Sequence, residues 1–250
     1  MMEDEYDTMR AVEDQHWWYH ALGEMVVRDL RKIVLANPDL RILDVGCGTG
    51  GMLDRLRKHY PSSHLQGIDF FPKAVAFTQA RGFPEVREAN ANQLPFDTAS
   101  MDVIISLDVL YHKAVDQTLT LSGCQRVLKP GGVLILNLPA YDILRGQHDI
   151  AVSGARRYRP ATLRALLLRS GFEVATLHAW NSWLFLPMLF HRQMSRFFQA
   201  SDHANIRGDL KLPSPLINNV LAHCCRLDTK LSRLLRIPLG PSLYAIARRV

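Results

Sequence analysis

The sequence predicts an α/β protein with a Rossmann-like, seven-stranded, mostly parallel sheet that has helices on both faces. Three observations lead to this prediction. From residue 41 onward, short β-branched runs alternate with helical patterns, which is typical of βαβ units. A glycine-rich turn at residues 46–51 follows the first of these runs. The run at residues 101–107 is almost continuously apolar, as expected of a strand covered on both faces.

The expected strands and helices follow one another in a regular order. Strands are predicted at residues 41–45, 64–69, 85–89, 101–107, 133–138, 172–179 and 242–247. Helices are predicted at residues 51–59, 72–80, 115–127 and 162–170, where Pro72 suits a helix start and Gly171 a helix end. The Lys-Pro-Gly-Gly segment at residues 129–132 is expected to form the turn before the fifth strand.

Two segments fall outside this alternation, and they set the predicted domain organisation. Residues 1–40 are expected to form an N-terminal helical lid, and residues 181–240 a helical cap inserted before the last strand. The Rossmann-like core then spans residues 41–180, and residues 241–250 supply the final strand of its sheet.

Charge and apolar patterning limit the protein classes that fit. Residues 151–250 hold 15 Lys and Arg against 4 Asp and Glu, within a chain of net charge +6. Such a basic half fits nucleic acid, anionic lipid, an acidic substrate or solubility alone. The acidic first fifteen residues do not resemble a signal peptide, and the apolar stretch at residues 183–190 is too short to span a bilayer. Because the four cysteines show no disulfide or zinc spacing, we expect a cytoplasmic protein without a bound metal, soluble or peripheral to a membrane.

The glycine loop is the most informative feature. Residues 42–51 read Ile-Leu-Asp-Val-Gly-Cys-Gly-Thr-Gly-Gly. A predicted strand enters a loop that largely lacks Cβ atoms, so a ligand can approach the backbone with a helix N-terminus behind it. Gly46, Gly48 and Gly51 also satisfy the GxGxxG pattern, and Asp69 ends the second strand, where an acid binds ribose hydroxyls. The loop alone therefore fits a dinucleotide or another adenosyl ligand.

The motifs that follow the loop resemble those of the class I methyltransferases that depend on S-adenosyl-L-methionine (SAM). The Asp-Val-Gly-Cys-Gly-Thr-Gly segment is similar to their first motif, and Gly-Ile-Asp at residues 67–69 to their second. Residues 88–96 resemble the stretch that contacts adenine. Residues 101–107 resemble the fourth strand, and residues 128–132 the turn before the fifth. The resemblance implies methyl transfer from SAM, with S-adenosylhomocysteine as the product.

The resemblance also implies which residues hold the cofactor. Asp44 would bind its amino-acid end and Asp69 its ribose, while Asn90 would contact the adenine at a position where many relatives have Asp. The full expected set is Asp44, Gly46, Cys47, Gly48, Asp69, Phe70, Asn90, Ala91 and Leu107.

Candidate catalytic and acceptor-binding residues lie near the predicted strand ends and in the N-terminal segment. Methyl transfer from a sulfonium needs alignment, and a base only where the acceptor loses a proton. His112 and His148 are candidate bases because histidine titrates near physiological pH, although either also fits a loop histidine that only hydrogen-bonds. The candidates for acceptor binding are Trp18, Tyr19, Arg157 and Tyr158. The aromatic pair also fits a hydrophobic lid, and the arginine a solvated helix approach.

The acceptor is expected to be a small or lipid-like molecule that is methylated on an O or N atom. The fourth strand ends in Ser-Leu-Asp-Val at residues 106–109, not in the Asn-Pro-Pro-Tyr type of motif common in methyltransferases of nucleic-acid bases. A nucleic-acid substrate is therefore disfavoured. An NAD(P)-dependent oxidoreductase with the same loop and a non-catalytic, membrane-associated SAM-binding protein stay open as alternatives, and the sequence indicates no oligomeric state.

Residues 216–236 carry apolar residues at helical spacing, with Arg226 and Lys230 beside the stripe. An ordinary amphipathic helix packs its apolar face on the core, and we expect that arrangement here. Contact with an anionic membrane surface is the alternative.

Overall fold

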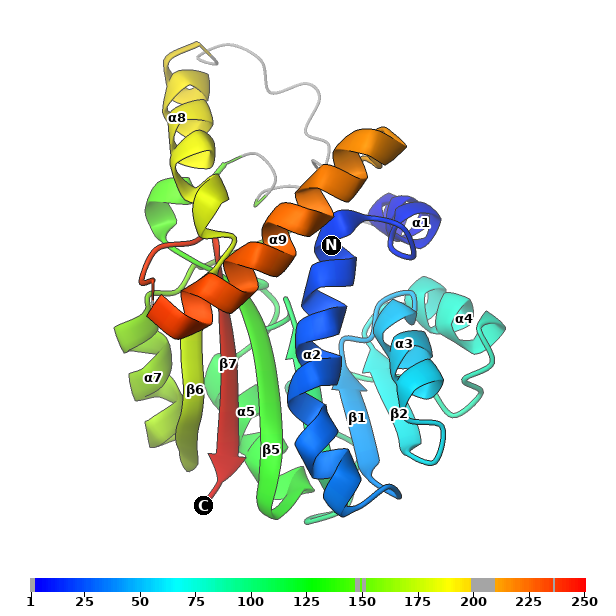
Figure 1. Ribbon diagram of the computed structural model, residues 1–250. Helices are drawn as coiled ribbons and strands as arrows, with labels where there is room; N and C mark the ends of the chain where they lie inside the picture. Colours follow the sequence, from blue (N-terminus) through cyan, green and yellow to red (C-terminus); the bar gives the residue numbers. More distant parts are fainter. Residues whose placement is uncertain (1–2, 147–148, 150–151, 199–209, 236) are drawn as a thin grey trace.

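The computed structural model describes residues 3–146, 149, 152–198, 210–235 and 237–250. Its centre is a seven-stranded sheet in the order β3-β2-β1-β4-β5-β7-β6, in which β7 runs antiparallel to both of its neighbours (Figure 1). The strands are β1 Arg41–Val45, β2 His64–Asp69, β3 Arg87–Glu88, β4 Met101–Leu107, β5 Leu128–Pro139, β6 Phe172–Trp180 and β7 Ser242–Arg249. The predicted seven-stranded, mostly parallel sheet is confirmed.

The helices form where the sequence supplies start signals. Pro72 and Pro160 stand in the first turns of their helices, and Asp116 caps a third by accepting from the backbone N–H groups of Thr118 and Leu119 at 2.8 and 3.0 Å. The helices are α1 Glu3–Val12, α2 Trp17–Ala36, α3 Gly51–His59, α4 Pro72–Ala80, α5 Gln117–Val127, η1 Asp142–Leu144, α7 Pro160–Arg169, α8 Ser182–Phe198 and α9 Pro215–Leu235.

Helices cover both faces of the sheet, because side chains alternate between the faces along each strand. Leu134 and Leu136 of β5 pack in one apolar cluster with residues of α5 and α7. Val133 and Ile135 pack in a second cluster with residues of α2, α3 and α9. Figure 1 shows α2 and α9 crossing in front of the sheet.

The two N-terminal helices take different places. Met9 of α1 lies over the glycine loop, since a Cβ added at Gly48 would be 2.8 Å from its Cε atom. By contrast α2 is a core helix, with Met25, Val26 and Leu30 fully buried. Of the predicted lid, α1 and the first turns of α2 therefore cover the end of the sheet that carries the loop, since Trp18, Tyr19 and Leu22 line the cavity there.

Helix α9 presents the opposite face to the one expected. Its inward side is small and polar, with Cys225, Asp228, Thr229 and Ser232 buried. Its apolar stripe is exposed instead, through Leu216, Ile217, Val220, Leu227, Leu231, Leu234 and Leu235. The expectation that this stripe packs on the core is wrong, because α2 and the start of α8 offer hydrogen-bonding groups to α9 rather than an apolar groove.

Two smaller differences concern chain segments between elements. Residues 129–132, expected as a turn, are included in β5, although Gly131 has the positive φ of 73° that a tight turn needs. The third strand is only two residues long, shorter than predicted. In the part of the chain that the structure describes, no helix is long and apolar enough to cross a bilayer.

Candidate cofactor and acceptor site

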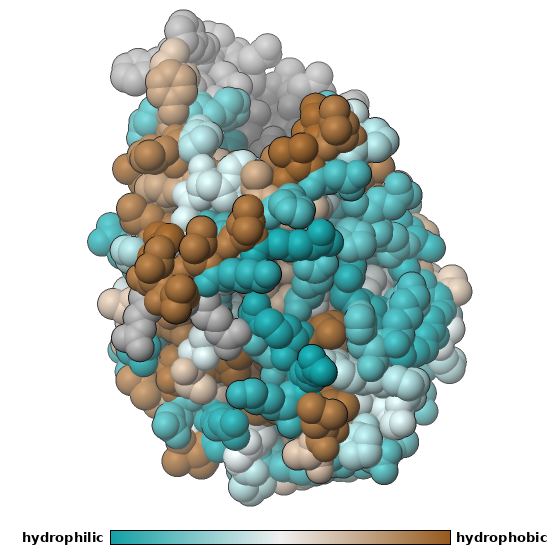
Figure 2. Space-filling model, viewed as in Figure 1, coloured by the Kyte–Doolittle hydropathy of each residue, from teal (hydrophilic) through white to brown (hydrophobic). Residues whose placement is uncertain are grey.

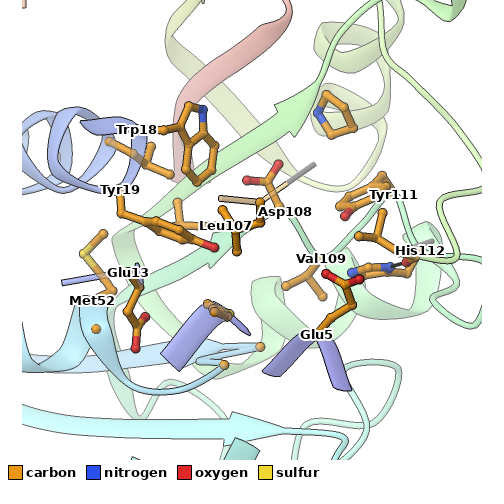
Figure 3. Close-up of a pocket in the computed structure, with 18 of the residues that line it drawn as sticks. Glu5, Glu13, Trp18, Tyr19, Met52, Leu107, Asp108, Val109, Tyr111 and His112 are labelled. Atoms are coloured by element: carbon orange, nitrogen blue, oxygen red, sulfur yellow. Dashed lines mark hydrogen bonds between the residues drawn. The ribbon is translucent and has the colours of Figure 1, made fainter. Parts of the chain in front are cut away.

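A cavity of about 850 Å³ opens at the carboxyl ends of β1, β2 and β4, the edge where parallel α/β sheets bind ligands (Figure 3). All nine expected cofactor residues line it: Asp44, Gly46, Cys47, Gly48, Asp69, Phe70, Asn90, Ala91 and Leu107. Four other candidates line it as well: Trp18, Tyr19, His112 and Arg157.

The glycine loop is shaped by close contacts that exclude larger residues. Gly46, Gly48 and Gly50 have φ values of 77°, 56° and 86°, a region that L side chains rarely adopt. A Cβ at Gly46 would lie 2.3 Å from Cγ2 of Val109. The loop is anchored to the next strand, because the N–H groups of Gly46 and Cys47 donate to the Ile68 carbonyl at 2.8 and 3.0 Å.

Asp69 joins the loop to the lid helix. One carboxylate oxygen accepts from the N–H of Gly48 at 2.9 Å, and the other accepts from the Tyr6 hydroxyl and the Phe71 N–H, both at 3.1 Å. Burial raises the pKa of Asp69 above its usual value, although these hydrogen bonds lower it in part. A carboxylate has about four acceptor positions, so a further hydroxyl can still bind.

A second anchor of α1 was missed by the sequence analysis. Glu13 directly follows α1. It accepts a hydrogen bond from the Thr49 hydroxyl of the glycine loop and pairs with Arg81 at 2.6 Å. Both charged side chains are buried. The spacing of the acidic N-terminal residues does not identify this long-range ion pair.

The acceptor side of the cavity contains a carboxyl group beyond β4. Asp108 has a φ of 56°, and its carboxylate accepts from the Asn137 side-chain amide at 2.9 Å. The amide oxygen of Asn137 in turn accepts from the indole N–H of Trp180 at 2.8 Å. Burial raises the pKa of Asp108 to about 7, although Asn137 and the charge of Arg157 lower it. Figure 3 shows Asp108 between Tyr19 and Tyr111.

The two candidate histidines have different outcomes. His112 lines the cavity, and its Nδ1 lies 2.8 Å from the Val152 carbonyl, so this nitrogen carries the proton and Nε2 is left as the acceptor. Burial lowers the pKa of His112 to about 4. The ring is therefore neutral at pH 7 and a weak base. His148 lies outside the described residues.

Arg157 and Tyr158, the two acceptor-binding candidates that follow β5, form hydrogen bonds within the protein. Arg157 pairs with Asp149 through two hydrogen bonds of 2.8 and 3.1 Å and donates a third to the Ala140 carbonyl at 2.9 Å. This buried pair stiffens the cavity wall. Tyr158 is buried outside the cavity lining, and its hydroxyl bonds the Leu110 carbonyl and the Gln117 side chain at 3.0 and 2.8 Å.

Comparison with known proteins agrees with this geometry. The family model described as "Methyltransferase domain" matches residues 43–136, from the first strand through the middle of β5. Residues 43–136 form a class I SAM-dependent methyltransferase domain.

Relatives with curated names extend the match. A probable S-adenosylmethionine-dependent methyltransferase of Mycolicibacterium smegmatis is 33% identical over 171 residues, covering 67% of this chain and 63% of that protein. Malonyl-[acyl-carrier protein] O-methyltransferase 1 of Coxiella burnetii is 33% identical over 124 residues, covering 50% of this chain and 42% of that protein. The methyltransferase domain thus matches, while the chain spans only part of the length of these relatives.

The fold matches a solved methyltransferase structure over most of the chain. A putative sarcosine dimethylglycine methyltransferase from Galdieria sulphuraria superposes with a TM-score of 0.62 at 16% identity, covering 92% of this chain and 86% of that one. At this identity the likeness concerns the fold alone, including its seven-stranded sheet.

The residues of the methyltransferase domain fit SAM in charge as well as shape. Asp44 is buried on the cavity wall, and its carboxyl group has no hydrogen-bond partner among the described residues. Burial, followed by the negative charges of Asp69 and Glu13, raises the pKa of Asp44 to about 8. A cationic ligand would offset the electrostatic repulsion among these carboxyl groups. SAM carries two such cations, an ammonium group and a sulfonium. Asp44 would hold the ammonium, Asp69 the ribose and Asn90 the adenine.

This charge arrangement predicts that SAM binding releases a proton. At pH 7 the Asp44 carboxyl is mostly protonated, and an ammonium beside it lowers its pKa, so about one proton leaves on binding. Calorimetric titration at pH 7 in phosphate and in Tris should therefore give heats that differ by the ionisation enthalpies of the two buffers.

The Asp44→Asn variant is the matched control, because it keeps the size of the side chain and loses the proton. Its heats of SAM binding should agree in the two buffers. Equal heats for the unmodified protein would contradict the assigned charge state of Asp44.

Proposed function

We propose that the protein transfers a methyl group from SAM to an O or N atom of a small or lipid-like acceptor. The observation that carries the proposal is the continuity of the cavity. The same cavity is lined by the glycine loop, Asp69 and Asn90 and by Trp18, Asp108 and residues of α8. An acceptor in the outer part of the cavity would lie next to a cofactor in the inner part.

When bound, SAM supplies an activated methyl group on a sulfonium sulfur. The protein contributes alignment and a site from which water is excluded. Tyr19 and Tyr111 point toward the space beside Asp108, and burial raises the pKa of both hydroxyls (Figure 3). Both tyrosines are therefore neutral and can donate hydrogen bonds to an acceptor oxygen or nitrogen.

Asp108 is the base that this geometry favours. Its pKa of about 7 is close to the working pH, where a general base is most effective. The hydrogen bond from Asn137, itself held by Trp180, fixes the carboxylate orientation. An acceptor hydroxyl would pass its proton to Asp108 as its oxygen bonds to the methyl carbon, whereas an acceptor ammonium would pass a proton first and so free the electron pair on nitrogen. The bond between the methyl carbon and sulfur would break in the same transfer, with S-adenosylhomocysteine as the product. His112, with a pKa of about 4, is a weaker candidate.

The apolar part of the wall supports a lipid-like acceptor. It includes the side chains of Trp17, Trp18, Leu22, Val115, Leu184, Met188 and Leu210. Such a lining binds hydrocarbon or aromatic groups through the hydrophobic effect. We further propose a cytoplasmic protein that contacts membranes peripherally, where lipid-like acceptors reside.

Label transfer from methyl-labelled SAM tests the acceptor class. Purified protein is incubated with a bacterial extract, and the label is counted in the organic, aqueous small-molecule, protein and nucleic-acid fractions. The proposal predicts label in the organic or small-molecule fraction. Label confined to protein or nucleic acid would contradict it.

Replacement of Asp108 tests the base. Asp108→Asn keeps an oxygen that can accept from Asn137, so the fold and SAM affinity should be preserved while turnover falls about 10²–10⁴-fold. In the unmodified protein, turnover should rise with pH through about 7 as Asp108 loses its proton, and this rise should vanish in the variant.

His112→Asn serves as the comparison. If His112 were the base, the rise would be centred near pH 4 and this variant, rather than Asp108→Asn, would abolish it. Full turnover by Asp108→Asn would remove Asp108 from the chemistry.

A further inference from the structure

Large apolar side chains are exposed together on α8, on α9 and beside them. Of the eighteen such residues that are exposed in the described part of the chain, twelve lie between residues 186 and 239. Figure 2 shows apolar patches over α8 and over both ends of α9, with hydrophilic residues beside the middle of α9. Contiguous exposed apolar surface on a protein usually marks an interaction site.

The exposed face of α9 is fixed by specific contacts on its inward side. The Asp228 carboxylate accepts from the Ser182 backbone N–H at 3.0 Å, and the Cys225 thiol donates to the Asn181 side chain at 2.8 Å. Asn218 accepts from the Trp17 N–H at 3.0 Å and donates to the Gln15 carbonyl at 2.7 Å. These partners lie at the first residues of α8 and α2 or one to two residues before them, so α9 cannot rotate its leucines inward without losing these hydrogen bonds.

The exposed stripe continues along one face of the helix. Val220, Leu227, Leu231 and Leu234 follow at intervals of seven, four and three residues, which places them on one side. Leu227, Leu231 and Leu234 are 54%, 49% and 78% exposed. The stripe is therefore long enough to enter an apolar medium as one surface.

Charge beside the stripe indicates the chemistry of the partner. Lys230 is exposed on α9 next to the stripe, and Lys211 is exposed just before the helix begins. Residues 181–240 contain 8 Lys and Arg against 3 Asp and Glu. Apolar side chains flanked by cations fit the interface of a bilayer with anionic headgroups.

The stripe lies close to the entrance of the cavity. Helix α8 supplies Leu184 and Met188 to the cavity wall, while its Leu186 and Phe190 are 70% and 68% exposed. Lys211 and Pro213, just before α9, also line the cavity. A partner surface that contacts α8 and α9 would therefore lie beside the cavity, and molecules from that surface would have a short path into it.

We propose that the exposed apolar faces of α8 and α9 dock the protein on an anionic lipid bilayer, with the cavity entrance toward the membrane. This inference rests on the membrane contact proposed above and assigns its surface and its lipid charge, and it does not depend on which acceptor is methylated.

Vesicle flotation with the full chain tests the docking surface. The protein should bind vesicles of phosphatidylcholine containing phosphatidylglycerol, and bind pure phosphatidylcholine weakly. Added salt should reduce binding, since the cations are exposed. The variant Leu227→Gln/Leu231→Gln/Leu234→Gln should lose at least about tenfold in vesicle affinity, because three side chains no longer transfer to the lipid. Lys230→Glu should weaken binding to the anionic vesicles alone.

The matched control replaces exposed leucines elsewhere. Leu35, Leu119 and Leu168 are 76%, 55% and 55% exposed on α2, α5 and α7, and their triple Gln variant should bind vesicles as the unmodified protein does. SAM binding by each variant, measured by calorimetry, shows whether the fold and the cofactor site are intact, so loss of docking and loss of the reaction are distinguishable.

Three results would overturn the proposal. The first is an intact protein that does not bind anionic vesicles, and the second is equal loss of binding in the control variant. The third is a dimer, measured by light scattering, that dissociates in the α9 variant while vesicles are not bound, which would assign the face to a second copy of the chain.

Discussion

The carboxylate of Asp69 is the contact on which the site depends. It accepts from the Gly48 N–H and from the Tyr6 hydroxyl, and so joins the end of β2, the glycine loop and the lid helix α1. The Gly48 carbonyl also accepts from the Thr78 hydroxyl of α4 at 2.8 Å, so two side chains hold this glycine at its positive φ of 56°. The shape of the cofactor wall and the position of the lid are therefore set together.

The cofactor wall could be predicted from the sequence, and two other features could not. Parallel strands bring their carboxyl ends to one edge, so Asp44 and Asp69, each near the end of a strand, had to meet. The role of Asp108 depends on its left-handed backbone and on its contact with Asn137, which only the pairing of β4 with β5 reveals. The spacing of the leucines of α9 identifies a common face, but periodicity does not say whether that face meets protein or solvent.

Buried carboxyl groups divide the cavity into two chemical regions. Near the glycine loop, burial and the negative charges of Asp69 and Glu13 raise the affinity of Asp44 for a proton or a cation, which suits an ammonium and a sulfonium. At the outer end, Asp108 stands among aromatic side chains and has a pKa near neutrality. The first region suits a ligand that carries positive charge, and the proposed base lies in the second. Helices α8 and α9 extend this apolar character from the cavity wall to the protein surface.

Parallel calorimetric titration with SAM, S-adenosylhomocysteine and NADH tests which ligand the glycine loop binds. We predict micromolar binding of SAM and S-adenosylhomocysteine and no binding of NADH. Asp69→Ala should weaken SAM binding at least about tenfold, through lost hydrogen bonds to the ribose. Binding of NADH without binding of SAM would contradict the assigned cofactor and indicate a dinucleotide-dependent oxidoreductase.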